Sequence, residues 1–495
     1  MNGIRQATLS GLKWGTAIQL GQNLLGILAT LALARLLGKD DFGLVALVTA
    51  ILALLATLVD LGFGAALIQK REVGAPEIST AFYSTLLLGL ALTAAAIAFA
   101  PLLAHFWEKP ALVPVLMVSS SLLTIRAFAS VPTALYEREL QLRAIAGLTL
   151  GANLVGSIVK IALAWGGAGV WSLVFGEIII QGLISLSLWM RLRDRISFAL
   201  VSRERFVSLF RFGRSITLTN LLNNLSRNVD VLVVGKLLPA GLLGIYTVSL
   251  GITNLLSNSC TAIIQRIAFP AFARVQDDPQ RLRKGYLEAL QYSAALIVAP
   301  TLGLGLVAAE FVEVVLSNKW TEGIPVIRIL TVYAAVNALG GPLWGQVLKA
   351  TGHVSLLLRM TVLRVVALPV AIVIGSFWGL LGICYGIVAY AVIFRLVYQH
   401  MVNRYIHIRM KDFFAAVAPA LLASAVMTGC VIAVSAALEP LPLPVVVLLI
   451  IKVAVGAAAY IAALLMVGRP LALGLWHILA STVPGLGRSG RHRPW

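Results

Sequence analysis

The sequence predicts an all-α, polytopic membrane protein with about fourteen transmembrane helices. The first reason is composition: 59% of the 495 residues are hydrophobic and 12% are charged, whereas soluble domains carry about 25% charged residues. The second is a series of apolar segments, each long enough to cross roughly 30 Å of hydrocarbon. The third is the placement of Lys and Arg, which gather in every second gap between those segments.

The apolar segments are close to the length of about 20 residues that a membrane-spanning helix needs. Their approximate limits are 12–36, 43–67, 81–104, 111–134, 144–165, 169–190, 212–237, 242–267, 285–308, 324–348, 355–375, 378–401, 413–437 and 444–467. No gap between them is long enough to fold a soluble domain.

The basic residues predict the orientation of the chain. One set of gaps is poor in them and holds Lys39, Lys109, Lys236 and Lys319. The other set is rich in them and holds Lys70, Arg71, Arg138, Arg143, Arg191, Arg193, Arg195, Arg203, Arg205, Arg274, Arg281, Arg283, Lys284, Arg404, Arg409 and Lys411. Since cytoplasmic loops are the positive ones, we expect both termini in the cytoplasm. The net charge of +19 therefore reports topology, and we expect no nucleic-acid partner.

The two halves of the chain repeat a pattern. Residues 36–45 align with residues 237–246, which places Gly43 opposite Gly244, and residues 12–15 parallel residues 210–213. We therefore expect two pseudo-symmetric six-helix bundles, at 1–195 and 212–405, followed by two additional helices and a basic cytoplasmic tail at 406–495. The basic segment between the bundles, 196–211, is expected to be an amphipathic linker on the cytoplasmic surface or a plain positive loop.

Charged residues inside the apolar segments are the candidates for a functional site. They are Asp60, Arg126, Lys160, Glu177, Arg227, Asp230 and Arg364, with Lys452 close to the end of a span. A charge at the bilayer centre costs at least roughly 2.5–3.5 kcal/mol, so such residues normally face an internal cavity. The cysteines, Cys260, Cys384 and Cys430, have no metal-like spacing, and we predict neither a metal site nor a cofactor.

The segment around residue 225 is the most polar of the predicted spans. Arg227 and Asp230 lie three residues apart and could simply pair with each other. Asn220, Asn223 and Asn224 add hydrogen-bonding capacity beyond one ion pair, as sugar ligands require. The excess of cations favours an anionic ligand such as a pyrophosphate or a uronic acid. Asp60, Glu177 and Asp230 are candidates for coupling to H⁺ or Na⁺, or are structural counter-ions.

Several motifs resemble Wzx-type polysaccharide flippases of the MATE-like exporter superfamily, in the colanic-acid-type branch. They are RLLG at 35–38, DLGFG at 60–64 and LIQK at 67–70, the stretch from Asn220 to Asp230, LGIY at 243–246, PAFARVQDDP at 270–279, Trp320 and LKATG at 348–352. The motifs occur in the same order as in the family. Lys236 and Pro239 depart mildly from its pattern, where Arg and Gly are expected.

The resemblance implies a flippase that moves undecaprenyl-pyrophosphate-linked oligosaccharide repeat units across the bacterial inner membrane for exopolysaccharide, O-antigen or capsule synthesis. The two bundles would form a V around a hydrophilic cavity and expose it to each side in turn. Arg126, Lys160, Arg227 and Arg364 would hold the glycan head, together with the three asparagines, Asn220, Asn223 and Asn224. Polysaccharide polymerase and co-polymerase proteins are the partners implied.

Two other functions stay open at this point. A drug or cation antiporter of the same superfamily would share the architecture. A membrane glycosyltransferase or polysaccharide polymerase is the enzymatic alternative, suggested by Asp40 and Asp41 in the first periplasmic gap. The short periplasmic gaps argue against an enzyme, and the residues that match this pair in the second half, Gly241 and Leu242, suit a turn better than a catalytic site.

Overall fold

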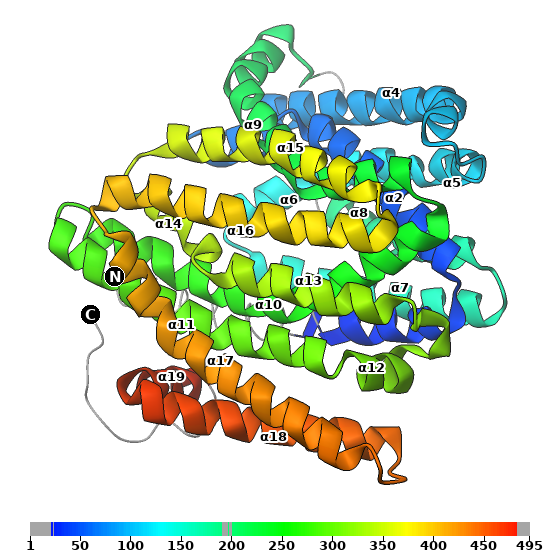
Figure 1. Ribbon diagram of the computed structural model, residues 1–495. Helices are drawn as coiled ribbons and strands as arrows, with labels where there is room; N and C mark the ends of the chain where they lie inside the picture. Colours follow the sequence, from blue (N-terminus) through cyan, green and yellow to red (C-terminus); the bar gives the residue numbers. More distant parts are fainter. Residues whose placement is uncertain (1–20, 23, 191–196, 198–199, 483–495) are drawn as a thin grey trace. The chain divides into compact units, whose positions relative to one another are not determined.

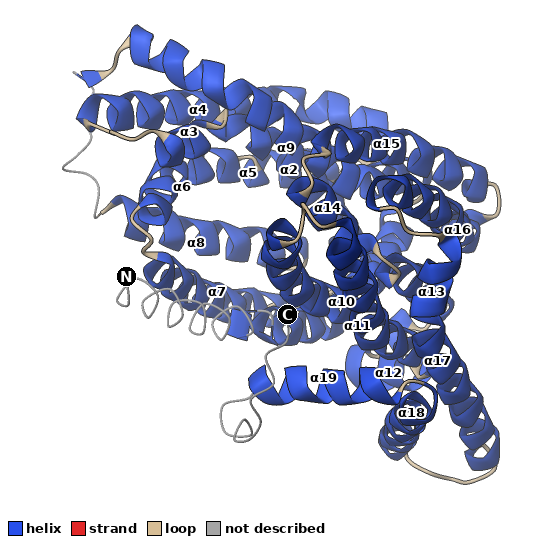
Figure 2. Cartoon of the chain, turned by 90° about the vertical axis from the view of Figure 1, so that its left-hand side faces the viewer, coloured by secondary structure: helices blue, strands red, loops and turns tan. Residues whose placement is uncertain are grey.

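The computed structural model describes residues 21–22, 24–190, 197 and 200–482, and in this part of the chain every regular element is a helix (Figure 1). Figure 2 shows only helices and connecting loops among these residues. After a helix at Leu24–Leu36, the elements are α2 (Lys39–Asp60), α3 (Phe63–Gln69), α4 (Ala75–Trp107), α5 (Leu112–Ser119), α6 (Ser121–Arg138), α7 (Leu142–Trp165), α8 (Val170–Trp189), α9 (Arg203–Leu237), α10 (Ala240–Arg274), α11 (Pro279–Leu306), α12 (Ala308–Phe311), η3 (Val312–Leu316), η4 (Asn318–Trp320), α13 (Gly323–Ala338), α14 (Gly341–Ala350), α15 (Val354–Ser376), α16 (Gly379–Ile406), α17 (Met410–Leu438), α18 (Val445–Val467) and α19 (Arg469–Thr482).

The described helices confirm an all-α membrane protein with many spans. Eleven helical segments are long and apolar enough to cross a bilayer, and each overlaps one of the predicted spans. The other three predicted spans correspond to Leu24–Leu36 and Ala240–Leu255, which are shorter apolar helices, and to α9, which is too polar to qualify. The number fourteen therefore stays a prediction.

Two segments predicted as single spans are divided by left-handed residues. Leu61 and Gly62 have φ angles of 48° and 73° and separate α2 from α3, while Gly340, at 93°, separates α13 from α14. Helices commonly end at such residues because glycine carries no Cβ penalty there. A Cβ at Gly62 would also lie 2.6 Å from the carbonyl oxygen of Gly213 on α9, so this glycine is required by the packing as well.

The segment between the predicted bundles differs from the expected linker. Helix α9 begins at Arg203, so the last residues of the predicted linker continue directly into the helix. Residues 191–196 and 198–199 lie outside the described part of the chain. The backbone amides of Ser197 and Ser202 donate to the hydroxyl groups of Ser79 and Thr80 on α4, over 3.0 and 3.1 Å.

The backbone packs into two compact units. The first takes the chain up to Val248 together with Thr361–Ile383, and the second takes Ser249–Met360 and the chain from Cys384 onward. Helices α10, α15 and α16 therefore contribute to both. The bundle limits at residues 195, 211 and 405 rest on the sequence repeat and remain a prediction. Helix α19, which contacts α18 and α11, stands where the sequence predicted only a tail.

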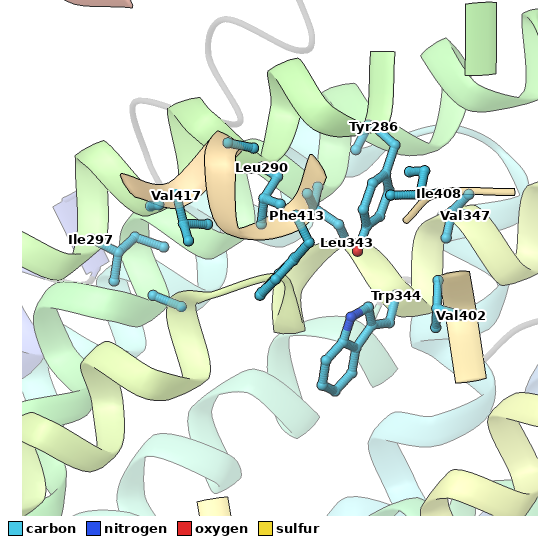
Figure 3. Packing of buried hydrophobic residues seen from close by; sticks show 14 of the residues in the cluster. Tyr286, Leu290, Ile297, Leu343, Trp344, Val347, Val402, Ile408, Phe413 and Val417 are labelled. Atoms are coloured by element: carbon cyan, nitrogen blue, oxygen red, sulfur yellow. The ribbon is translucent and has the colours of Figure 1, made fainter. Parts of the chain in front are cut away.

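Each unit has its own buried cluster. In the first unit Phe63 of α3 packs with Phe82 of α4, Leu135 of α6 and Leu209 of α9. In the second unit the cluster joins α11, α14, α16 and α17, and Figure 3 shows Tyr286, Leu343, Trp344 and Phe413 within it. Because lipid tails are as apolar as these side chains, helix association in a membrane depends on close packing and interhelical hydrogen bonds.

The two repeated turns meet each other inside the first unit. A Cβ on Gly43 would lie 1.9 Å from the carbonyl oxygen of Ala240, and a Cβ on Gly244 would lie 1.9 Å from that of Lys39. Gly43 aligns with Gly244 in the repeat, and Lys39 aligns with Ala240. The contact is therefore reciprocal, as a local two-fold relation between the repeats requires. It gives structural support to the alignment of these two turns.

We predict that Gly244→Ala destabilises the protein and that Gly251→Ala, on the same helix α10, does not. The new Cβ at position 244 meets a backbone oxygen that cannot rotate away, and such overpacking costs about 1–3 kcal/mol. Position 251 has no atom within 4 Å of its Cβ, and alanine favours a helix over glycine by up to about 1 kcal/mol. Thermal unfolding of the purified variants measures the difference. Equal midpoints would contradict the close contact.

Candidate functional site

Helix α9 presents the predicted amide-rich face. Asn220, Asn223 and Arg227 are exposed on it, and their spacing of three and four residues puts them on one side of the helix. Asn224 is half-buried and donates from Nδ2 to the Thr57 hydroxyl of α2 over 2.8 Å. Asn224 thus helps to fix the helix, whereas the three exposed side chains are accessible to a ligand.

The N-terminal end of α9 is fastened to other helices of the first unit. The guanidinium of Arg205 lies 2.8 Å from the carboxylate of Glu77. The ammonium of Lys70 forms a second ion pair with the same carboxylate, at 3.1 Å. The ring of Phe206 meets that of Phe63 edge-on, with 5.7 Å between the centroids. The polar helix is therefore held in place ahead of its binding face.

The C-terminal end of α9 is held by the residues that follow α4. Lys109 donates from Nζ to the carbonyl oxygens of Gly235 and Leu238 over 2.5 and 2.9 Å. These carbonyls stand at the helix end, where a positive charge is stabilised. Burial lowers the pKa of Lys109. Lys236 pairs with Glu108 at 2.6 Å, and its hydrogen bond lowers the pKa of that carboxyl.

Asp230 is engaged by α10 and α15 rather than by its own helix. It accepts a hydrogen bond from the Tyr246 hydroxyl over 2.9 Å, and the positive charge of Arg364 attracts it. Its second oxygen, Oδ1, is buried and receives no hydrogen bond from any described residue. The alternative in which Arg227 pairs with Asp230 is wrong for the described part of the chain, which holds no such ion pair.

Lys160, Glu177 and Arg126 form a second group, on α7, α8 and α6. Lys160 lies 3.0 Å from Glu177, which also accepts from the Gln181 amide over 3.0 Å. Arg126 is more distant, at 4.0 Å. The stem of Lys160 can reach this position because residue 176 is a glycine, whose Cβ would lie 2.0 Å from Lys160 Cγ. Glu177 and Lys160 thus compensate each other, which supports the counter-ion alternative for Glu177.

Asp60 lies in a pocket beside this group. The pocket has a volume of about 400 Å³ and is lined by α2, α3 and α6 through Asp60, Gly64, Ala65, Ile68, Arg126, Ala129, Ser130, Thr133, Ala134 and Glu137. Asp60 accepts from the Ser130 hydroxyl over 2.5 Å and from the Gly64 amide over 3.2 Å. The structure thus brings Asp60 and Arg126, far apart in sequence, into one polar pocket.

The sequence analysis did not single out Ser130, Thr133 and Glu137. With Arg126 they recur on α6 at intervals of four, three and four residues, so that all four lie along one helix face. That periodicity was present in the sequence, and it would have marked a polar stripe on an otherwise apolar span. All ten predicted site residues lie in the first unit, either on this pocket and its neighbouring pair or around α9.

The second unit contains polar contacts that were not predicted from the sequence. Lys452, in the first half of α18, is half-buried and pairs with Glu310 of α12. Arg395 of α16 lies over the ring of Trp344, with 4.1 Å to the centroid, and donates to Asn337. Gln399 accepts from Trp344 over 2.9 Å. These contacts tie helices of the second unit together.

Comparison with known proteins assigns the family. A model of the family described as "Polysaccharide biosynthesis protein" matches residues 32–325, which is more than half of the chain. The chain belongs to this family. The Escherichia coli K12 protein "Lipopolysaccharide biosynthesis protein WzxC" is 28% identical over 77% of this chain and 78% of its own length. Bacillus subtilis "Teichuronic acid biosynthesis protein TuaB" is 24% identical over 93% of this chain and 96% of its own.

Solved structures place the fold. A lipid II flippase, MurJ, in an inward closed conformation superposes with a TM-score of 0.72 at 12% identity, covering 92% of this chain and 99% of that one. An inward-facing multidrug-resistance MATE family transporter of the MOP superfamily gives 0.62 at 19% identity, covering 78% and 94%. Together with the sequence relatives, these likenesses confirm the predicted relationship to Wzx-type flippases within the MATE-like superfamily.

We predict that Lys160→Met and Glu177→Gln each destabilise the protein and that the double variant recovers most of the loss. Lys160→Met leaves Glu177 with only the more distant Arg126, at 4.0 Å, and Glu177→Gln leaves Lys160 without the carboxylate that it faces. Because the two side chains are 17% and 34% exposed, we expect about 1–2 kcal/mol per single change, less than for a fully buried pair. Thermal unfolding of the four proteins measures the coupling between the two sites. Additive losses would show that the two charges do not depend on each other.

Proposed function

We propose that the protein is a flippase for lipid-linked oligosaccharides, specifically for undecaprenyl-pyrophosphate-linked repeat units of a surface or secreted polysaccharide. Membership of the polysaccharide biosynthesis family is the observation that carries this proposal. The amide and guanidinium groups of α9 and the hydroxyl-lined pocket of α6 support it, because a glycan offers many hydroxyl groups to such donors and acceptors. We place the protein in the bacterial inner membrane with both termini cytoplasmic.

The mechanism follows from the contrast between the two parts of such a substrate. The glycan and pyrophosphate head is polar, and we assign to it the accessible groups of Arg126, Asn220, Asn223 and Arg227. Three further residues predicted to bind the head, Lys160, Asn224 and Arg364, are engaged by Glu177, Thr57 and Asp230. The polyprenyl tail needs no passage through protein, since it dissolves in the bilayer. Alternating exposure of the polar residues to the two membrane faces moves the head across. The sequence predicts Asp60, Glu177 and Asp230 as candidates for coupling to H⁺ or Na⁺. We assign the coupling to Asp230, whose Oδ1 is buried and receives no hydrogen bond from any described residue. Polymerase and co-polymerase proteins receive the product.

The enzymatic alternative is disfavoured by the position of Asp41. Its carboxylate Oδ2 accepts from the backbone amide of Gly38 over 3.0 Å, which is the geometry of a helix cap at the start of α2. Asp40 contacts the Gly241 position, where a Cβ would lie 3.1 Å from its Oδ1. These two carboxylates therefore serve the turn, which supports the proposal of a transporter over an enzyme. A drug antiporter would share this fold, and the deletion experiment below distinguishes it from a flippase.

Deletion of the gene tests the function. We expect loss of the surface polysaccharide and accumulation of lipid-linked repeat units on the cytoplasmic side, both restored by the wild-type gene. Lipid extraction with glycan analysis and immunoblotting for polysaccharide provide the readouts. Normal polysaccharide together with new sensitivity to cationic drugs would favour the antiporter, and accumulation of unpolymerised units in the periplasm would favour the polymerase.

Within that assay, Arg227→Ala should reduce polysaccharide export by about tenfold or more, since an exposed guanidinium that binds phosphate or sugar contributes about 1.5–3 kcal/mol. Arg281→Ala is the matched control, because Arg281 is 78% exposed and, among the described residues, forms an ion pair with Asp278 alone, within its own helix turn. Protein abundance is measured for both variants. Export at the wild-type level in Arg227→Ala would remove this residue from the binding surface.

A further inference from the structure

We call the pocket around Asp60 and Arg126 the α6 pocket. It contains a hydrogen-bond acceptor and a hydrogen-bond donor that no described residue uses. Both hydrogen bonds that Asp60 accepts from described residues end on its Oδ1. Its Oδ2 accepts none from any described residue and is not buried, so it faces the pocket that Asp60 lines. The Arg126 side chain is 40% exposed and donates no hydrogen bond to a described residue. An acceptor and a planar donor thus face one space.

Hydroxyl groups extend this pattern along α6. Ser130 donates to Asp60 over 2.5 Å and Thr133 donates to the carbonyl oxygen of Ala129 over 2.7 Å. Each hydroxyl oxygen keeps acceptor capacity after giving its proton. The remaining wall is apolar, from Ala65, Ile68 and Ala134. A few polar groups on an otherwise apolar wall, in a volume of about 400 Å³, fit the general form of small-ligand pockets, which span roughly 300–1,000 Å³.

The charge balance of this region disfavours an anion. Among the residues that line the pocket, Asp60 and Glu137 supply two carboxylates, against the one cation Arg126. Lys160 is already engaged by Glu177 at 3.0 Å. An arriving phosphate or uronate would meet Asp60 and Glu137 as like charges, and such contacts cost free energy. The sequence-based expectation of an anionic ligand therefore does not suit this pocket, although it stands for the exposed Arg227 of α9.

A bare metal cation is disfavoured for a different reason. Arg126 has its charge on the pocket wall, where it would repel a cation, and its donors would have no role in a cation site. A ligand that both donates and accepts, without net charge, uses every group present: hydroxyl protons to Asp60, ring and hydroxyl oxygens to Arg126, and apolar ring faces to the alanines. That ligand is an uncharged pyranose.

We infer that the α6 pocket is a subsite for one neutral hexopyranose ring of the transported glycan, with Asp60 and Arg126 as its recognition pair. This inference rests on the proposed function and sharpens it. The predicted orientation puts the C-terminal end of α6, with Glu137 and the neighbouring Arg138, on the cytoplasmic side. The subsite is therefore close to the side on which the lipid-linked unit is loaded, and the anionic pyrophosphate is bound elsewhere.

Saturation-transfer NMR on the purified full-length protein tests the subsite, in a detergent without a sugar head group. The probes are the methyl glycosides of glucose, galactose and mannose, each paired with its uronate counterpart, and inorganic pyrophosphate followed by phosphorus NMR. We expect at least one neutral glycoside to bind about five- to tenfold more tightly than its uronate, which is the effect of one nearby like charge in a partly exposed site.

Variants assign that preference to the pocket. Arg126→Met should weaken binding of the neutral glycoside. Asp60→Asn keeps an acceptor for the Ser130 hydroxyl but removes the negative charge, so it should reduce or reverse the ratio of neutral-glycoside affinity to uronate affinity. Glu313→Gln, an exposed carboxylate in the other unit, is the matched control and should leave both affinities unchanged. Gel filtration and thermal unfolding confirm that the variants are folded. If Asp60→Asn does not fold, Ser130→Ala provides the second test of the pocket.

Three results would overturn the subsite. They are a wild-type preference for a uronate or for pyrophosphate that depends on Arg126, saturation transfer to no neutral glycoside, or a response of the pocket variants to Na⁺ alone. None of these results would rescue or remove the flippase itself, which the deletion strain tests separately. If the deletion strain loses its polysaccharide but the purified protein prefers a uronate, the flippase function stands and the neutral subsite is wrong.

Discussion

The cost of placing charge in hydrocarbon is the constraint on which this structure depends. Each intramembrane charge is stable only where another group pairs with it or forms a hydrogen bond to it, or where water reaches it. Lys160 forms an ion pair with Glu177, and Lys452 forms one with Glu310. Asp230 accepts a hydrogen bond from Tyr246. Those pairs lock helices together and leave little for a ligand. The candidate site is consequently built from the polar groups that stay accessible, on the exposed face of α9 and in the α6 pocket, and this separates positioning from binding.

Glycine makes that separation possible by letting backbones and long side chains approach. Gly213 of α9 lies against the carbonyl of Leu61, where a Cβ would be 2.0 Å away. Gly176 makes room for the stem of Lys160 in the same way. Without a hydrophobic force between helices in lipid, such close packing supplies much of the association energy. The polar α9 helix is therefore held at both ends and through Asn224, while the face with Asn220, Asn223 and Arg227 remains exposed.

The sequence was sufficient for the all-α membrane fold, for eleven of the predicted spans and for the family, because length, hydropathy and motif order are local properties of the chain. Partner choice is not local. Asp230 finds Tyr246 across a turn, and Lys452 finds Glu310 from 142 residues away. No pattern in the chain announces these pairs before it folds. The breaks at Gly62 and Gly340 were missed for a related reason, since each glycine is required by a neighbouring segment rather than by its own. The polar stripe on α6, Arg126, Ser130, Thr133 and Glu137, is different, because its helical spacing is a local property that the sequence alone contains.

The central claim is that this protein moves a lipid-linked glycan between leaflets without changing it. The most direct measurement is translocation in proteoliposomes that contain the purified protein and the lipid-linked unit extracted from a polymerase-deficient strain. Exposure of the glycan to an impermeant oxidant reports which leaflet it occupies. The account predicts protein-dependent transfer of intact units from one leaflet to the other. Transfer no faster than in empty liposomes, or chemical alteration of the glycan by the protein, would contradict it.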